Sequence, residues 1–159
     1  MTLTVNKKKY CESIKRVMET EGNAILNRSE KITPDINEAI ELIISCNGRV
    51  IVTGMGKSGI IGKKIAATLA STGTPSMFLH PAEGLHGDLG MVTEEDIVLG
   101  ISNSGETEEL LQTIPSIKRI GAKIIALVGN SNSTLAEKSN VVISYGVIQE
   151  ACPLGLAPT

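Results

Sequence analysis

Two short loops carry the residues whose types and spacing best suit chemistry on an anionic ligand. Each loop follows an apolar run and precedes a helix-like segment: they are Gly54-Met55-Gly56-Lys57-Ser58-Gly59 and Ser102-Asn103-Ser104-Gly105-Glu106-Thr107. A helix N-terminus offers unpaired backbone N–H groups, and nearby hydroxyls add further donors, so such a loop can bind phosphate. Two of them in one small domain predict a phosphorylated ligand.

The first loop admits several interpretations. Its Gly-x-Gly-x-x-Gly spacing matches the dinucleotide fingerprint, but the next predicted strand ends Phe78-Leu79-His80, without the acidic residue that this fingerprint requires. A Walker A loop would need glycine at position 51, which is isoleucine. Lys57 is then either a cation that faces a phosphate or a developing oxyanion, or a solvated lysine at a helix start, where the helix dipole disfavours it.

The second loop holds more polar groups than a helix cap needs. One Ser or Thr suffices to cap a helix, whereas this loop offers three hydroxyls and one amide in six residues. We therefore predict that it binds the phosphate. Glu106, Glu108 and Glu109 fall in the first turn of the following helix, where carboxylates stabilise the dipole in any case. A catalytic and a structural role remain open for each of them.

Three further residues stand where a ligand could reach them. His80 and His86 belong to a loop from His80 to Gly90, and metal binding, a contact to a sugar hydroxyl and a proton relay all remain open for them. Glu150 follows the last predicted strand, at the carboxyl edge of the sheet, where open α/β folds bind ligands. A solvated surface glutamate is the alternative there.

The elements that must position these residues alternate along the chain. Five apolar runs read as buried strands, at 49–53, 76–79, 96–101, 123–128 and 141–144. Helical patterns separate them at 58–72, 107–120 and 134–138, with Gly73 and Gly121 as C-terminal caps and Pro115 expected to kink or split its helix. Two more helices, at 8–26 and from Thr33-Pro34 to Ile43, precede the first strand. The pattern predicts a doubly wound α/β fold with a five-stranded parallel sheet covered on both faces.

Composition limits the number of domains, the partners and the cellular location that we expect for this fold. The 159 residues fit a single domain, 1–159, and a net charge of −2 argues against nucleic-acid or anionic-membrane partners. Charges or glycines interrupt every apolar run before the roughly 18 residues that a membrane span needs. The three cysteines are odd in number and widely spaced, so free thiols and a cytoplasmic location are expected.

Beyond single loops, the chain carries five motifs in a fixed order: Gly54–Gly59, Ala70–Ser76, His86–Gly90, Ile101–Glu106 and Glu150–Thr159. From about residue 45 onward they resemble the arabinose 5-phosphate isomerases, of the sugar isomerase (SIS) domain superfamily. The resemblance implies a flavodoxin-like SIS fold and interconversion of D-ribulose 5-phosphate and D-arabinose 5-phosphate through an enediolate.

The resemblance also assigns roles by motif. It implies Lys57, Glu109 and Glu150 as catalytic residues; a base and an oxyanion partner are what this chemistry needs, with Glu150 the first choice for the base. It implies substrate contacts at Ser58, Gly73, Thr74, His86, Ser102, Asn103, Ser104 and Thr107. His80 matches a position where zinc is inhibitory, and no cofactor is required.

Finally, the resemblance implies what surrounds this domain. SIS domains pair through helices, so a homodimer or homotetramer that uses the 8–26 helix is expected. Members of the family carry a further helix, a catalytic histidine in a His-Pro-Gly segment and, in longer members, a pair of CBS modules beyond the point that matches Thr159. We therefore expect a SIS domain truncated at its C-terminus. A non-catalytic sugar-phosphate-binding module and a nicotinamide-dependent oxidoreductase are the alternatives.

Overall fold

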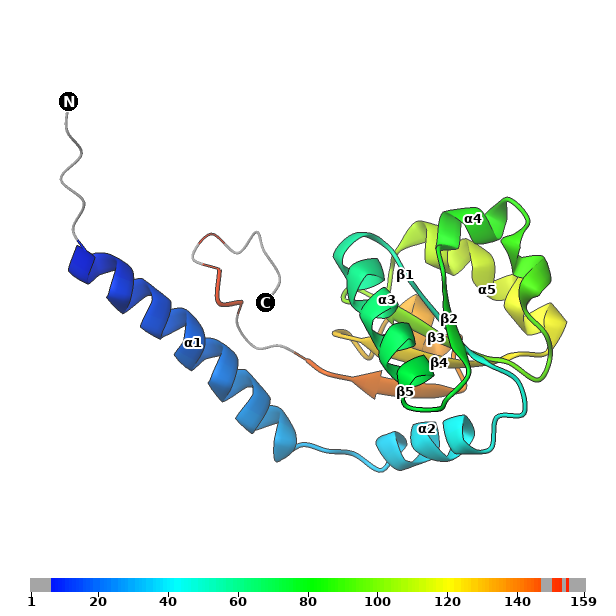
Figure 1. Cartoon of the computed structure of the whole chain (residues 1–159), viewed down its shortest axis with the longest axis horizontal. Coiled ribbons are helices and arrows are strands. Elements are labelled where there is room, and N and C mark those ends of the chain that lie inside the picture. Colours follow the sequence, from blue (N-terminus) through cyan, green and yellow to red (C-terminus); the bar gives the residue numbers. More distant parts are fainter. Residues whose placement is uncertain (1–6, 147–149, 153, 155–159) are drawn as a thin grey trace. The chain divides into compact units, whose positions relative to one another are not determined.

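The computed structural model describes residues 7–146, 150–152 and 154 (Figure 1). These residues form two compact units. One unit contains the helix α1 (Lys7–Ser29) together with Glu150–Cys152 and Leu154, and the other spans Thr33–Gly146. The motif at Glu150–Thr159 is therefore described only at Glu150, Ala151, Cys152 and Leu154, and its remaining residues lie outside the described part.

A five-stranded, all-parallel sheet forms the centre of the second unit. Its strands are β1 (Val50–Gly54), β2 (Ser76–Leu79), β3 (Ile97–Ser102), β4 (Lys123–Val128) and β5 (Val141–Ser144). They lie in the order β2-β1-β3-β4-β5, so the winding of the chain reverses between β1 and β3. This is the flavodoxin-like order, and the predicted α/β fold class and all five predicted strands are confirmed.

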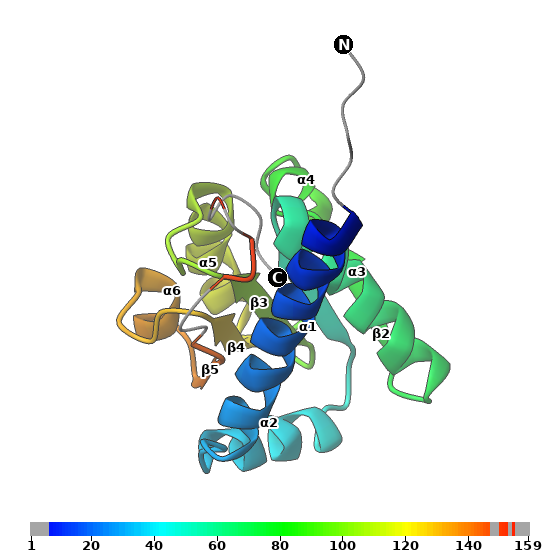
Figure 2. The same ribbon diagram turned by 90° about the vertical axis from the view of Figure 1, so that its left-hand side faces the viewer.

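Helices cover both faces of the sheet because the strands are apolar on both sides. The helices of this unit are α2 (Asp35–Ile44), α3 (Gly56–Ser71), α4 (Pro81–Leu85), α5 (Glu108–Ile120) and α6 (Thr134–Glu137), with a 3₁₀ helix η1 (Asp88–Met91). Figure 2 shows α5 and α6 on one side of the strands and α3 on the other. Along β1, Ile51 packs under α5, whereas Val50 and Val52 join the cluster that α2 and α3 cover.

Three expectations about where helices begin are corrected. The segment from His80 to Gly90 is not an open loop: Pro81 stands at the first position of α4, where its fixed φ favours a helix, and η1 follows. Helix α3 begins at Gly56 rather than residue 58, so Lys57 lies inside its first turn. Pro34 precedes α2 as its cap, one position earlier than expected.

Helix α5 runs without interruption across Pro115 and is not split. A proline inside a helix costs roughly 3 kcal/mol because one backbone hydrogen bond is lost. Leu110, Ile114 and Ile117 are fully buried on both sides of Pro115, and their packing against the sheet holds the helix together. Gly121 ends α5 with φ of +97°, as predicted for a glycine cap.

A charged cluster fastens the amino edge of the sheet. Asp96, just before β3, is 2% exposed and accepts hydrogen bonds from the backbone N–H groups of Arg49 and Thr93, at 2.7 and 2.8 Å. The Arg49 guanidinium pairs with the Asp96 carboxylate at 3.1 Å. Burial raises the pKa of Asp96, but the hydrogen bonds from Arg49 and Thr93 and the charge of Arg49 outweigh it, so the pKa lies below its ordinary value.

Candidate functional site

The two predicted loops meet at the carboxyl edge of the sheet. Strands β1 and β3 are neighbours, and Gly54 at the end of β1 pairs with Ile101 near the end of β3. The loops that follow therefore leave the sheet side by side, at the point where the winding reverses (Figure 1). Open α/β sheets bind their ligands at such a reversal point. The topology thus brings together the residues that the sequence singled out first.

Glycines give the first loop its tight shape. Gly56 has φ of +54°, a conformation that L side chains rarely adopt. A Cβ atom at Gly59 would lie 2.6 Å from the carbonyl oxygen of Gly54, so only glycine lets α3 start so close to β1. The helix then places Lys57 at the exposed start of α3 and Ser58, next to it, in a half-buried position.

The hydroxyls of the second loop first stabilise the loop itself. Ser102 is the last residue of β3 and is 1% exposed; its Oγ lies 2.8 Å from Oγ1 of Thr107 and accepts the N–H of Gly105 at 3.0 Å. Ser104 Oγ accepts the N–H of Glu106 at 3.1 Å. Thr107 precedes α5, whose first N–H groups have no partner within the helix. The loop therefore holds a rigid shape beside a helix N-terminus that can accept an anion.

A further loop, before α6, supports the Ser102–Thr107 loop from outside. Thr134 donates its N–H to the Glu106 carboxylate at 2.7 Å, and Leu135 donates its N–H to the carbonyl of Gly105 at 3.1 Å. The backbone and hydroxyl hydrogen bonds of Thr134 lower the pKa of Glu106, and Lys138 adds to this effect. Glu106 therefore connects two loops, which favours the structural role for this residue over the catalytic one.

Gly105 shows how closely these two loops pack. Its φ is +71°, and a Cβ atom there would overlap Oγ of Ser133, which is buried and caps α6. Nothing but glycine fits between them. The sequence analysis did not single out Ser133; the Ser-Thr pair before a short helical pattern was the signal that could have found it.

The Asn103 side chain is held by residues from two other strand ends. Gly129, just after β4, donates its N–H to the backbone carbonyl of Asn103 at 3.0 Å, and a Cβ atom at Gly129 would overlap Asn103 Oδ1. Tyr145, just after β5, donates its hydroxyl to the same Oδ1 at 3.0 Å. Sequence reasoning missed both residues, since neither belongs to a motif and only the strand order brings them to Asn103.

Glu109 and His80 stand close after strand ends, and His86 ends α4, the helix that follows His80. Glu109 is half-buried in the first turn of α5. His80 follows β2 directly at the carboxyl edge, half-buried with its ring 6.4 Å from that of Phe78, and among the described residues its buried Nδ1 has no hydrogen-bond partner. His86 is exposed at the end of α4. The catalytic role predicted for Glu109 and the binding roles predicted for His80 and His86 remain predictions.

Gly73 and Thr74 lie at the opposite edge of the sheet. They follow α3 and precede Ser76, which pairs with Val50 at the start of β1. Gly73 has φ of +97° and Thr74 donates its N–H to Leu69, the geometry of a glycine helix end. Within one copy of the chain, the structure therefore does not bring these two residues to the loops.

Glu150 belongs to the unit that contains α1 and is half-buried there, so its predicted role as the base also stays a prediction. For His80, a zinc site requires about four ligands. Among the described residues, no group of three or more His, Cys, Asp and Glu side chains could hold a metal ion. The described residues of one copy therefore do not fit a zinc site, and no step of the reaction is assigned to zinc.

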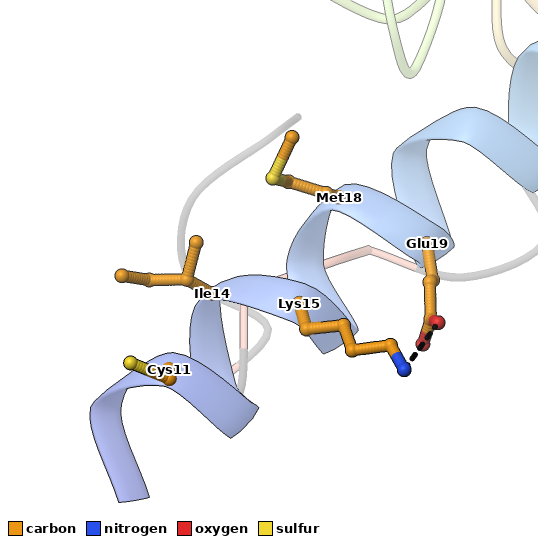
Figure 3. A pocket seen from close by; sticks show the side chains of 5 residues that line it. All are labelled: Cys11, Ile14, Lys15, Met18 and Glu19. Carbon is orange, nitrogen blue, oxygen red and sulfur yellow. Dashed lines mark ion pairs between the residues drawn. The ribbon is translucent and has the colours of Figure 1, made fainter. Parts of the chain in front are cut away.

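A separate hollow of about 480 Å³ lies along α1 and contains none of the predicted site residues. Figure 3 shows Cys11, Ile14 and Met18 beside it, together with Lys15 and Glu19, which form an exposed ion pair at 3.6 Å.

Within the described part of the chain, none of the helices combines the length and the apolar character needed to cross a bilayer.

Comparison with known proteins places this geometry in a family. The chain is 51% identical over 94% of its length to a probable arabinose 5-phosphate isomerase of Haemophilus influenzae and to the arabinose 5-phosphate isomerase KdsD of Pseudomonas aeruginosa. It spans 44% and 46% of these two proteins, less than half of their length. These relatives do not favour the alternatives of a non-catalytic module or an oxidoreductase.

Solved structures agree with the sequence relatives. A protein of Escherichia coli CFT073 in complex with arabinose 5-phosphate matches with a TM-score of 0.93 and 43% identity, over 98% of this chain and 82% of that one. A putative phosphosugar isomerase of Bacteroides fragilis matches with a TM-score of 0.90 and 42% identity, over 94% and 80%. Residues 43–159 also match the model of the SIS domain. The chain therefore belongs to the SIS domain family.

Proposed function

We propose that this chain belongs to an enzyme that interconverts D-ribulose 5-phosphate and D-arabinose 5-phosphate. The observation that carries the proposal is the juxtaposition of the Lys57 loop with the Ser102–Thr107 loop at the reversal point of the sheet. Relatives named arabinose 5-phosphate isomerases, at 51% identity, support the same assignment.

In the proposed arrangement, the Ser102–Thr107 loop and the start of α5 bind the phosphate, with Ser58 adding a contact from α3. Backbone N–H groups, hydroxyls and the Asn103 amide supply donors for its oxygens, and binding the phosphate positions the sugar carbons for reaction. The loop is stabilised by its own hydrogen bonds before the ligand arrives, so little ordering is required on binding.

The reaction moves a proton between adjacent carbons through an enediolate. A carboxylate removes the proton from one carbon and returns it to the other, and we assign this role to Glu150, with Glu109 as the second candidate. Negative charge develops on the carbonyl oxygen meanwhile, and Lys57, at the exposed start of α3, stabilises it. A second proton passes from the hydroxyl oxygen on C1 to the oxygen on C2, which completes the exchange of hydroxyl and carbonyl. His86 contacts the sugar, and no cofactor takes part.

We test the assignment with Lys57→Ala and a matched control on the same helix. Incubation of the full enzyme to which the chain belongs with D-ribulose 5-phosphate should yield D-arabinose 5-phosphate. Lys57→Ala should lower kcat about 100-fold or more, as expected for the loss of a group that stabilises an oxyanion. Lys64→Ala, further along α3 and also exposed, should leave kcat unchanged. Binding of the sugar phosphate by the full enzyme without conversion would contradict the proposal.

We further propose that the protein is a homodimer or homotetramer in the cytoplasm. Helix α1 exposes Tyr10, Ile14, Met18 and Ile25 by 55%, 60%, 67% and 72%, a stripe at helical spacing that a second copy would cover. Pairing would also allow Gly73 and Thr74 of one copy to serve the site of another. Light scattering should give two or four copies, and a monomer at micromolar concentration would contradict this.

A further inference from the structure

The side-chain amide of Asn103 can either accept a hydrogen bond from a ligand beside it or donate one to that ligand. Its Oδ1 is a hydrogen-bond acceptor and its Nδ2 carries two donors. An oxygen turned toward a phosphate would repel it, whereas the N–H groups would bind it. The orientation of this one amide therefore decides whether the second loop attracts an anion at this position.

Gly129 shapes the space around the Asn103 side chain, and Tyr145 sets the orientation of its amide. Gly129 donates to the Asn103 backbone carbonyl, and its missing side chain leaves the space that Oδ1 occupies. The Tyr145 hydroxyl then donates to Oδ1 at 3.0 Å. Among the described residues, the Asn103 N–H groups form no hydrogen bond, whereas Oδ1 accepts one, so these donors can bind a ligand.

We propose that Tyr145 is a positioning residue of the phosphate site, which holds Oδ1 of Asn103 and so commits the amide to donate to the anion. This inference rests on the proposed function. Tyr145 comes to Asn103 from the end of β5, two strands away from β3, and adds a constraint that the loop's own hydroxyls do not supply. In the structure this hydroxyl donates to Oδ1, which leaves the two N–H groups of the amide for other partners.

Tyr145→Phe removes only the hydroxyl and tests the proposal. Loss of one hydrogen bond should raise the Kd for inorganic phosphate and the KM for D-arabinose 5-phosphate about fivefold. The value of kcat should stay within a factor of two, because Tyr145 does not act on the reacting carbons. Ser45→Ala, which removes an exposed hydroxyl just after α2, is the control and should change none of these values.

A double-mutant cycle separates positioning from a general effect on stability. In an Asn103→Ala background, Tyr145→Phe should have no further effect on phosphate binding, because the group through which it acts is gone. Additive losses, or a wild-type Kd in Tyr145→Phe, would overturn the inference. Failure of the wild-type chain to bind arabinose 5-phosphate would instead contradict the proposed function, so the two failures are distinguishable.

Discussion

The two edges of the same sheet are built from opposite kinds of residue. At the amino edge, a buried carboxylate and a guanidinium join the starts of β1 and β3 through Asp96 and Arg49. At the carboxyl edge, glycines and small hydroxyl residues shape the loops, and Lys57 is exposed beside them. At the amino edge, the charged groups satisfy one another and stabilise the sheet. At the carboxyl edge, backbone N–H groups and hydroxyls remain as donors for a ligand.

The largest expected effect comes from Gly105→Ala, at the carboxyl edge. The new methyl group would overlap the Ser133 hydroxyl and sit at φ of +71°. Strain and overpacking should lower the free energy of unfolding by about 3 kcal/mol and abolish measurable phosphate binding. Urea unfolding and calorimetric titration with phosphate would measure both. Gly90→Ala, with open space around its Cβ position, is the control and should bind normally.

Asp96→Asn tests the other edge. It keeps an acceptor oxygen but removes the charge that Arg49 pairs with, and should lower the free energy of unfolding by about 2 kcal/mol. The KM for D-arabinose 5-phosphate should not change, since the cluster lies at the edge away from the loops. A large rise in KM without a loss of stability would show that the two edges are not separate in function.

The dependence of stability on acidic pH should reveal how much Asp96 stabilises the amino edge of the sheet. The pKa of Asp96 is lower in the folded chain than its unfolded value of about 3.9, so its stabilising effect is complete above that value. The effect should disappear as the pH falls through the folded pKa. Stability measured from pH 6 downward should therefore fall more steeply below about pH 4 in the wild type than in Asp96→Asn. Equal slopes would remove this role for Asp96.

The smallest effect is expected where the Ser102–Thr107 loop contacts the loop before α6. Glu106→Ala removes the acceptor for the Thr134 N–H and should raise the Kd for phosphate roughly two- to fivefold. Glu106→Gln keeps an oxygen in place and should remain within twofold of the wild type. If the glutamine variant lost as much as the alanine variant, the charge of Glu106 rather than its hydrogen bond would matter.

The sequence allowed much of the fold to be predicted because its signals are local. Five uninterrupted apolar runs and the glycines after α3 and α5 located the strands and helix ends, and the order of motifs indicated the family. The helical character of 81–85 was missed, although Pro81 is a recognisable start signal. Pro115 was given too much weight, because the burial of its neighbours is a tertiary effect.

The site was predictable only in part, for the same reason. Lys57 and the Ser102–Thr107 loop follow adjacent strands, and their types could be read directly. Tyr145, Gly129 and Ser133 reach the loop through the strand order, which no local pattern contains. Gly73 and Thr74 show the opposite case, in which a motif marks residues that one copy of the chain keeps at the far edge.

The paired hydroxyls of Ser102 and Thr107 have a consequence for where protons point. Either hydroxyl can donate in this pair; the arrangement that gives the buried Ser102 proton an acceptor has Ser102 donating to Thr107 while its own oxygen receives the N–H of Gly105. The proton of Thr107, which is half-buried, is then turned outward. Each donor in such a chain polarises the next. The hydrogen bonds inside the loop thus leave the Thr107 hydroxyl proton at its surface, where it can donate to an arriving anion.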